Sequence, residues 1–558
     1  MSANHGDTVV FEESTTNNQP SAESNLFSIK KYAFITDSNS SSGSFSSNQM
    51  QFDLSNFASQ SQWINLPEAM LEFPVKVTIK NASSTAAVTA VATAGAAILK
   101  NGFHQFIDGC QLVIGSQTVQ NQVPYENIAA TWKILSNWSQ DELVKNGPSC
   151  GFALDDCTGA SEITLNNATA KGLNNVLYSD VANANVGLDV VGNQDKLINE
   201  GVSKRASFNN SNATVGTASL QQSVLDITAM QAAGRSHYAS QAGGVSGSPT
   251  ETWWSACYLA TVRLRDLVDL SEFPLVKNVK GYLYLSLNSG KVTVPANAAS
   301  GTMTMQTVGN TMPVLLNNSG YTPAAGGEAI TITASVDGTT AGLVPPCKPL
   351  ISAARLVCPY YIANPQTDAA LSKSNYFFTM QDKLYFTFDC ESNSTINQNI
   401  TSGVTNPKRI VMLPLLKAMG GATNVINPAL SAFDTSPATS SPFATMDQLQ
   451  VYVGNVPIYQ NPISMDYEAF KFEMAQTGLY GDMNDSSTSG LLSEQLWTQN
   501  HRWYTTDIGR RTGSDDGSSK SVQISYRNPN KLGQRVHGHL YHEKRYVIDT
   551  ATCTIVPL

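Results

Sequence analysis

The chain has 558 residues, too many for one hydrophobic core, so two or more domains are expected. Charged residues make up 14% of it, well below the roughly 25% of typical soluble domains, and the net charge is −9. This acidic balance gives no overall signature of nucleic-acid binding. The polar surface is mainly Ser, Thr, Asn and Gln, which suits β-rich loops and a molecule covered by its neighbours.

The start of the chain predicts a flexible arm. Residues 1–24 are polar, with neither a basic segment nor an apolar stretch, so we expect no signal peptide. The longest apolar run, residues 86–99, is rich in Ala and interrupted by Thr and Gly. A membrane span needs about 20 strongly apolar residues, so we expect none.

The eight cysteines predict no metal site, because none belongs to a Cys-x-x-Cys pair. Cys110 and Cys358 lie in apolar, strand-like runs, where a thiol serves as a small core residue. We therefore expect reduced, structural cysteines. Their positions are 110, 150, 157, 257, 347, 358, 390 and 553.

Short strand patterns fill the first half of the chain. Apolar and polar residues alternate most clearly at Leu71–Ile79, despite Pro74. Residues 146–249 are rich in Gly, Ala, Asn and Ser with weak periodicity, which favours an elaborated outer loop. Further strands are expected at 28–35, 50–57, 258–264 and 283–287.

A hairpin followed by a helix is predicted at residues 107–138. Gly115-Ser116 supplies a tight turn after a strand with three apolar residues at alternate positions: Cys110, Leu112 and Ile114. Pro124 precedes the helix, as is common at a first helical turn. Large residues then recur at spacings of three and four: Tyr125, Ile128, Trp132 and Leu135.

The same unit returns at residues 446–478. Its hairpin keeps three residues of the first one, with Asp447, Gln450 and Gly454 in the places of Asp108, Gln111 and Gly115. Tyr467-Glu468 then corresponds to Tyr125-Glu126, and the second helical face is Tyr467, Phe470 and Met474. We interpret the chain as two related β-rich domains in tandem.

We place the domain boundary at the prolines near residue 345. The first domain then covers 25–345 and the second 346–558, and the second opens with the strand 354–365. No stretch has the β-α-β rhythm of a parallel sheet, so many short strands with Gly/Pro turns favour all-β sandwiches or jelly rolls. Later strands are expected at 383–388, 409–416, 522–526 and 546–550.

His537 and His539 would share one face of a strand, with His542 nearby, which is an imaginable metal site. A fourth ligand is missing, and strand geometry turns His542 to the other face. We favour ordinary polar strand residues at all three positions.

Asp434-Thr435 and Asp549-Thr550 are similar to the paired aspartates of an acid protease, in which two carboxylates share one proton. Loop-forming residues follow the first pair, and the second lacks the usual Gly or Ser after Thr. Phosphate-loop, zinc-protease and nucleophile-elbow motifs are also absent. We expect no enzyme, hence no catalytic, metal-binding or cofactor-binding residues.

Several stretches, taken in order, resemble the double jelly-roll major capsid proteins of the polinton-like virus, virophage and adintovirus group. The resemblance covers most of the chain apart from 146–249 and 291–344. The stretches are 52–79, 101–139, 354–365, 400–416 and 521–549.

This resemblance implies two eight-stranded jelly rolls with short bracing helices and long loop insertions. Each helix would brace its own jelly roll, the first through Tyr125, Ile128 and Trp132. It also implies a pseudo-hexameric homotrimer that tiles an icosahedral shell around double-stranded DNA. The implied partners are neighbouring copies and a penton or minor capsid protein. The implied location is the virion, assembled inside the host cell.

The end of the chain is basic, with nine Lys and Arg against five Asp and Glu from His501 onward. We favour pairing between subunits, and non-specific contact with packaged nucleic acid is the alternative. Two other functions remain open. A lectin-like or surface-attachment tandem sandwich would need a signal peptide and an aromatic sugar platform. A hydrolase would need convergent acids or a metal.

Overall fold

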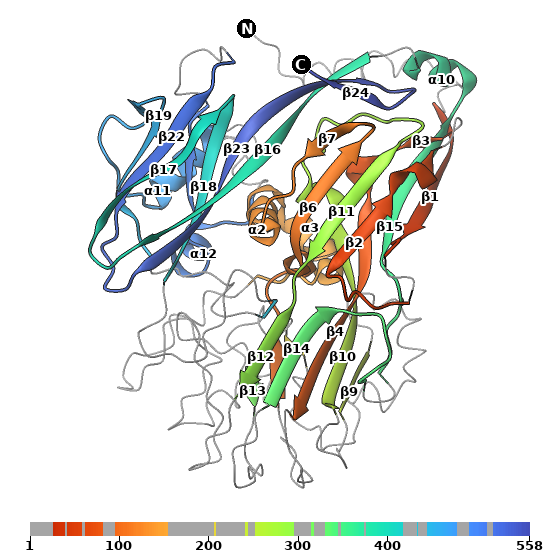
Figure 1. Cartoon of the computed structure of the whole chain (residues 1–558), viewed down its shortest axis with the longest axis horizontal. Coiled ribbons are helices and arrows are strands. Elements are labelled where there is room, and N and C mark those ends of the chain that lie inside the picture. Colours follow the sequence, from red (N-terminus) through yellow and green to blue (C-terminus); the bar gives the residue numbers. More distant parts are fainter. Residues whose placement is uncertain are drawn as a thin grey trace.

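A computed structural model of the chain forms two β-sandwiches side by side (Figure 1). The predicted arm at 1–24 and most of the insertion at 146–249 lie outside the described residues. The structure describes residues 26–39, 42–58, 62–81, 95–154, 206–207, 240–243, 252–294, 314–316, 330–343, 347–372, 375–416, 432–433, 444–476, 490–509 and 517–558.

The first sandwich contains two antiparallel sheets, with the orders β1-β15-β4-β10 and β2-β11-β6-β7. The first sheet consists of β1 (Phe27–Thr36), β15 (Arg355–Ala363), β4 (Met70–Asn81) and β10 (Thr252–Arg263). The second consists of β2 (Gln49–Asp53), β11 (Gly281–Leu287), β6 (Ile107–Ile114) and β7 (Gln117–Gln120).

The second sandwich repeats this plan with the orders β16-β23-β18-β21 and β17-β22-β19-β20. Its first sheet consists of β16 (Asn375–Cys390), β23 (Gln534–Asp549), β18 (Pro407–Leu416) and β21 (Tyr504–Asp507), with β24 (Thr554–Pro557) beside β23. Its other sheet consists of β17 (Thr395–Val404), β22 (Lys520–Arg527), β19 (Asp447–Val453) and β20 (Val456–Pro457).

Both sandwiches have the strand order of a jelly roll. Counted from one to eight along the chain, the strands lie in the orders 1-8-3-6 and 2-7-4-5 in each pair of sheets. The first set is β1, β2, β4, β6, β7, β10, β11 and β15, and the second runs from β16 to β23. This shared order confirms the predicted all-β class and the double jelly roll.

Short strands extend the first sandwich beyond its eight. They continue the β4–β10 side of the sheet toward the lower end of the molecule in Figure 1. They are β9 (Ser240–Gly243), β12 (Gly290–Val294) and β14 (Ile330–Val336), with β3 (Trp63–Ile64) pairing β15 elsewhere in the sheet. A separate small sheet holds β5 (Gly95–Ile98), β8 (Ala206–Ser207) and β13 (Val314–Leu316).

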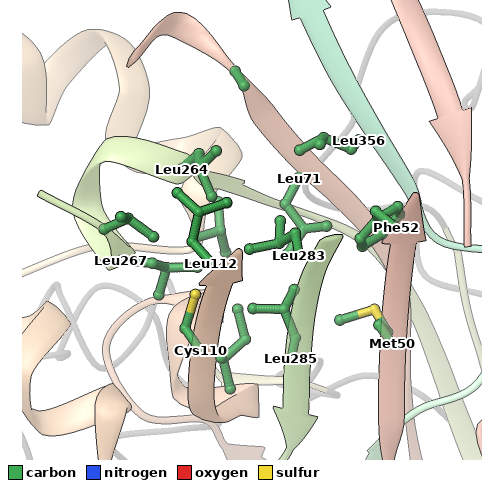
Figure 2. Close-up of a cluster of buried hydrophobic side chains, with 14 of the residues drawn as sticks. Met50, Phe52, Leu71, Cys110, Leu112, Leu264, Leu267, Leu283, Leu285 and Leu356 are labelled. Atoms are coloured by element: carbon green, nitrogen blue, oxygen red, sulfur yellow. The ribbon is translucent and has the colours of Figure 1, made fainter. Parts of the chain in front are cut away.

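The apolar residues of the two sheets in the first sandwich point toward each other (Figure 2). Burial of each such side chain stabilises the fold by roughly 1.5–3 kcal/mol. All of the residues labelled in the figure are at most 1% exposed: Met50, Phe52, Leu71, Cys110, Leu112, Leu264, Leu267, Leu283, Leu285 and Leu356. A second buried cluster fills the other sandwich and includes Leu449, Val451, Ile524, Val536 and Leu540.

The repeated hairpin accounts for the residues that recur in the sequence. Gly115 and Gly454 both adopt left-handed φ angles, 61° and 56°, at the turns that join the fourth strand to the fifth. The Asp108 carboxylate accepts a hydrogen bond from the Tyr125 amide, and Asp447 accepts one from the Ser464 hydroxyl. Each aspartate thus fixes the segment that leads into the following helix.

The predicted domain boundary near residue 345 is corrected by the strand pairing. The strand at 354–365 was expected to open the second domain, but β15 pairs with β1 along its length and with β4 at three residues. It is therefore the eighth strand of the first sandwich. Alternating apolar and polar residues identify a strand, but the sheet that it joins depends on pairing with strands hundreds of residues away in the chain. We propose that the boundary lies at α10 (Pro365–Leu371).

In the part of the chain that the structure describes, helices are few and mostly follow the hairpins. α2 (Glu126–Asn137) and α3 (Gln140–Cys150) follow β7, and α11 (Tyr467–Gln476) and α12 (Glu494–Gln499) follow β20. α3 shows that the insertion predicted from residue 146 begins inside a helix, capped by Ser139 and Glu142. Shorter turns are α9 (Leu264–Leu267), η1 (Leu54–Phe57), η2 (Leu66–Glu68) and η3 (Phe103–Phe106).

Candidate functional site: the helix between the sandwiches and the open sheet faces

Helix α2 lies between the two sandwiches, as Figure 1 shows. Trp132 is fully buried, with its ring 5.5 Å from that of Trp503 and 6.2 Å from that of Phe470, centroid to centroid. Both partners belong to the second sandwich. The helix was expected to brace its own jelly roll, and the structure corrects this expectation, because its large residues join one jelly roll to the other.

The first residue of α2 carries a buried ion pair across this contact. Glu126 is completely buried and its carboxylate binds the ammonium group of Lys383 on β16. The same ammonium donates to the carbonyl oxygen of Leu267 at 3.2 Å. Burial raises the pKa of Glu126, and the charge of Lys383 opposes that rise. The pair therefore fixes the position of the helix on the second sandwich.

Tyr125, just before the helix, packs on the face of β16 and β23. Its ring lies 4.8 Å from that of Tyr385 and 5.1 Å from that of His537. The Tyr385 hydroxyl and His537 Nδ1 are 2.8 Å apart. Phe386, the neighbour of Tyr385 in the strand, belongs to the buried cluster of the second sandwich. Tyr385 therefore lies on the outer face of that sheet, and α2 covers it.

A buried polar network holds the other side of α2 to the first sandwich. His104 Nε2 and the Thr131 hydroxyl are 2.7 Å apart, and Gln105 Nε2 donates to the same hydroxyl at 2.7 Å. Asn127 donates to Gln105 Oε1 at 3.0 Å. Burial lowers the pKa of His104 to about 3, so this imidazole is neutral at physiological pH.

The histidines considered as metal ligands serve this contact instead. His537 and His539 share one face of β23, as predicted, and burial lowers their pKa to about 4 and about 3. His542 lies 4.0 Å from the Asp382 carboxylate. Within the described residues, no three His, Cys, Asp or Glu side chains converge in a way that could hold a metal ion.

Only one of the two aspartates of the acid-protease hypothesis lies within the described residues. Asp549 caps the turn between β23 and β24, where its carboxylate accepts hydrogen bonds from the amides of Ala551 and Thr552. Desolvation raises the pKa of Asp549, but the hydrogen bonds from the Thr552 hydroxyl and from these two amides outweigh it, so the pKa is lowered overall. Asp434-Thr435 lies outside the described residues. Asp549 is thus a turn residue.

Three basic residues of the C-terminal region pair within the chain. Arg535 contacts Asp389 at 2.8 Å and Arg545 contacts Glu543 at 2.8 Å, while Lys544 binds Asp382. The Arg535 and Arg545 side chains are still 53% and 54% exposed, so pairing of this region between subunits stays a prediction. Arg510 and Arg511 lie outside the described residues.

An apolar surface remains open on the first sandwich. Tyr32 and Phe34 on β1 are 65% and 66% exposed. Phe34 stands in register with Val357 of β15, which is in register with Met70 of β4. Ile35, the neighbour of Phe34, is buried in the core, so this row points outward. We call this row, together with Tyr32, the open face.

The second sandwich carries exposed apolar residues on different elements. Val456 on β20 is 56% exposed, and Phe472 on α11 is 48% exposed. These elements correspond in the repeat to β7 and α2 of the first sandwich. Apolar residues gathered on such surfaces are a feature of protein–protein contact sites.

The long strands of the second sandwich also reach over the first. In Figure 1, β16, β23 and β24 extend across its upper end. Phe378 of β16 and Tyr546 of β23 belong to the buried cluster of the first sandwich, and the ring of Phe378 lies 5.4 Å from that of Phe273. The two jelly rolls therefore share a core at this end.

None of the helices in the described part of the chain is long and apolar enough to cross a membrane.

No family model and no curated protein matches the chain. Several solved structures are similar to it over nearly their full length. A chain of the Sputnik virophage structure, determined by cryo-electron microscopy, is 10% identical with a TM-score of 0.49, covering 97% of this chain and 90% of that one.

Two further similar structures are major capsid proteins. The mavirus protein is 9% identical with a TM-score of 0.47, covering 98% of this chain and 93% of its own. The faustovirus protein is 9% identical with a TM-score of 0.39, covering 96% and 94%.

Proposed function

We propose that the chain is a major capsid protein that assembles with copies of itself. One observation carries this proposal. Within the chain, α2 of the first sandwich covers the outer β16–β23 face of the second. The equivalent β1–β15 face of the first sandwich is the open face, and its apolar side chains are exposed.

The two jelly rolls thus have the same topology, but the outer sheet face is covered in the second and open in the first. Helix α2 of the first sandwich packs on the second sandwich, which carries an equivalent helix, α11. The described residues contain no third sandwich on which α11 could pack. A second copy of the chain supplies that surface through its open face. Such a contact is heterologous, because it joins two different surfaces of the chain. Its repetition closes a ring when the rotation from one copy to the next is a whole fraction of a full turn.

A ring of three copies contains six jelly rolls and gives a pseudo-hexamer. This is the arrangement implied by the sequence resemblance, and it is supported by the covered sheet face of the second sandwich and the open face of the first. The same resemblance leads us to propose further details of the assembly and of its role. They are an icosahedral shell, double-stranded DNA inside it, a penton or minor capsid partner, a location in the virion and no enzymatic role.

Interfaces between such copies belong to the obligate class, which buries roughly 2,000 Å² or more. The exposed apolar residues of the open face, α11 and β20 are suitable for such burial. The low content of charged residues, 14% of the chain, is consistent with a molecule whose sides are covered by neighbours.

Light scattering on the purified protein, with negative-stain images of the same fraction, tests this function. The proposal predicts a particle of about three times the 59.8 kDa chain mass with six lobes, or complete shells. A 59.8 kDa monomer that persists at high concentration would overturn it.

A further inference from the structure

The repeat extends to the surface that receives the helix. Lys383 and Tyr385 on β16 are matched by Lys30 and Tyr32 on β1, a Lys-x-Tyr motif on the first strand of each sandwich. In each sandwich this lysine stands in register with a tyrosine of the eighth strand, Tyr541 or Tyr361. The two sheets therefore present the same three side chains at equivalent places.

The motif of the second sandwich is occupied within the chain. Glu126 binds Lys383, and Tyr125 packs on Tyr385 with 4.8 Å between ring centroids. The Lys383 side chain is only 7% exposed as a result. A Tyr-Glu pair at the start of a helix thus fits onto a Lys-x-Tyr pair on a strand.

The motif of the first sandwich is open to solvent. The Lys30 side chain is 46% exposed, pairs with Glu68 at 3.3 Å and lies 5.1 Å from the ring centre of Tyr361. Hydrogen bonding to Tyr361 and Glu68 raises the pKa of Lys30, so it is charged at neutral pH. The surface around Lys30 and Tyr32 therefore has the same residue types and the same charge as the surface of Lys383 and Tyr385 that α2 covers.

The matching acid stands at the start of α11. Glu468, the counterpart of Glu126, has a side chain that is 79% exposed, and its ion pair with Lys471 is long at 4.0 Å. Tyr467 is engaged inside its own sandwich, where its hydroxyl donates to the Leu492 carbonyl at 3.1 Å. The carboxylate of Glu468 is thus the part of this motif that faces outward.

We propose that Glu468 of one copy binds Lys30 of the next, repeating between copies the Glu126–Lys383 pair found within each copy. This inference rests on the proposed self-assembly and identifies its contact residues. The partner is a second copy because the charges are complementary and the same motif pair is already joined inside the chain. Phe472 and the open face then supply the apolar contact around the ion pair.

Charge reversal tests the pair. Lys30→Glu and Glu468→Lys each place like charges together, and each is expected to raise the concentration for half-assembly at least tenfold. The double variant Lys30→Glu/Glu468→Lys restores opposite charges and is expected to recover most of the assembly. Light scattering over a concentration series gives the measurement.

Matched controls separate this contact from general effects of charge. Lys31→Glu makes the same change on the opposite face of β1, and Glu494→Lys makes it at the start of α12. Glu68→Gln tests whether the ion pair between Glu68 and Lys30 within one copy affects assembly. All three are expected to assemble as the unaltered protein does.

The outcomes distinguish the inference from the proposed function. If the unaltered protein does not assemble, the capsid proposal fails, and this inference fails with it. If it assembles and the charge reversals assemble as well as their controls, the ion pair is overturned while self-assembly stands.

A second inference comes from two cysteines. Cys257 on β10 and Cys347, ahead of β15, lie with their sulfur atoms 3.4 Å apart although 90 positions separate them in the chain. Both are buried, and Leu343 and Leu350 pack around them. The pair therefore joins a connecting segment to the outer face of the β4–β10 sheet.

The same segment is held at a second point. Lys76 of β4 contacts Asp337 at 2.6 Å and donates to the carbonyl oxygens of Thr339 and Ala341 at 3.1 and 3.0 Å. Since Lys76 stands in register with Cys257, the two attachments are neighbours across β4 and β10.

We propose that Cys257 and Cys347 form a disulfide in oxidising surroundings and remain thiols in reducing ones. With glutathione disulfide as oxidant, one thiolate attacks it and releases one glutathione. The second cysteine then displaces the other glutathione, and the two protons leave on the two glutathione thiols. The sequence predicts reduced cysteines, and this pair is the exception that the structure adds.

The bond would close a long loop and restrict the unfolded chain, so the oxidised protein is expected to melt about 5 °C or more higher. Contact with Cys347 and burial raise the pKa of Cys257, so closure is faster at pH 8.5 than at pH 7.

Peptide mapping after treatment of the folded protein with glutathione disulfide tests this pair. The expected product is a linked peptide containing Cys257 and Cys347, two hydrogens lighter than the separate peptides, together with the higher melting temperature. Both are lost in Cys257→Ser and Cys347→Ser. Five other buried cysteines, at 110, 150, 358, 390 and 553, serve as internal controls. Recovery of both residues as free thiols in the unaltered protein would overturn the proposal.

Discussion

Two residues at the contact between the sandwiches are charged and also buried. Glu126 and Lys383 are both buried, so the charge of either one would destabilise the fold if the other were removed. Their position could not be predicted from the sequence, because nothing local links a helix start to a strand more than 250 residues away. The recurrence of Tyr-Glu at the start of both helices is the sequence signal that marks this position.

Lys383→Met leaves the Glu126 carboxylate without its charge partner. We expect a loss of about 3–5 kcal/mol in the free energy of unfolding, because a buried carboxylate is then uncompensated. Denaturant titration followed by tryptophan fluorescence gives the value. Glu126→Gln/Lys383→Met is the control and is expected to regain most of the loss. A single variant as stable as the original protein would show that the pair does not join the sandwiches.

Trp132→Ala removes the largest apolar contact of α2 with the second sandwich. Because the ring is fully buried against Phe470 and Trp503, we expect a loss of about 3–5 kcal/mol. Trp132→Phe keeps an aromatic ring there and should lose less. Thermal melts monitored by circular dichroism compare the two, and an unchanged melting temperature for Trp132→Ala would contradict the role given to α2.

At the scale of elements, the hairpin and its helix were well predicted and the sheets were not. The turn at Gly115, the strands at β4, β6 and β11 and the start of α2 all follow from periodicity and turn chemistry within a few residues. The membership of β15 in the first sandwich and the role of α2 as a link were missed. Both depend on pairing between distant segments, which local patterns do not encode.

Neutral histidines in the packed elements predict sensitivity to acid. Burial lowers the pKa of His104 to about 3, of His537 to about 4 and of His539 to about 3. In the unfolded chain each takes up a proton near pH 6.5, whereas the folded chain does not. Stability is therefore complete above pH 6.5 and falls as the pH drops toward 4.

The expected slope is up to about 1.4 kcal/mol per pH unit for each of these histidines. Glu126 acts in the opposite direction, since its raised pKa lets the folded state bind a proton first. Urea titrations at pH 7, 6 and 5 measure the slope, and His537→Gln should reduce it. Equal stability at pH 7 and pH 5 would contradict the neutral state of the histidines.

The whole molecule is a pair of jelly rolls in which α2 covers one outer sheet face of the second sandwich, while the equivalent face of the first sandwich is open. The two-domain organisation and the all-β class followed from length, composition and the repeated hairpin. The direction of assembly did not, because it depends on which of two equivalent sheet faces is covered inside the chain. The structure supplies that asymmetry, with α2 on the β16–β23 face and exposed Tyr32 and Phe34 on the β1–β15 face.

A cryo-electron microscopy reconstruction of the purified, assembled protein tests the central proposal most directly. We expect a ring of three copies in which six jelly rolls alternate, with α11 of each copy against the open face of the next. A two-fold dimer, or a particle in which Tyr32 and Phe34 remain exposed to solvent, would contradict it.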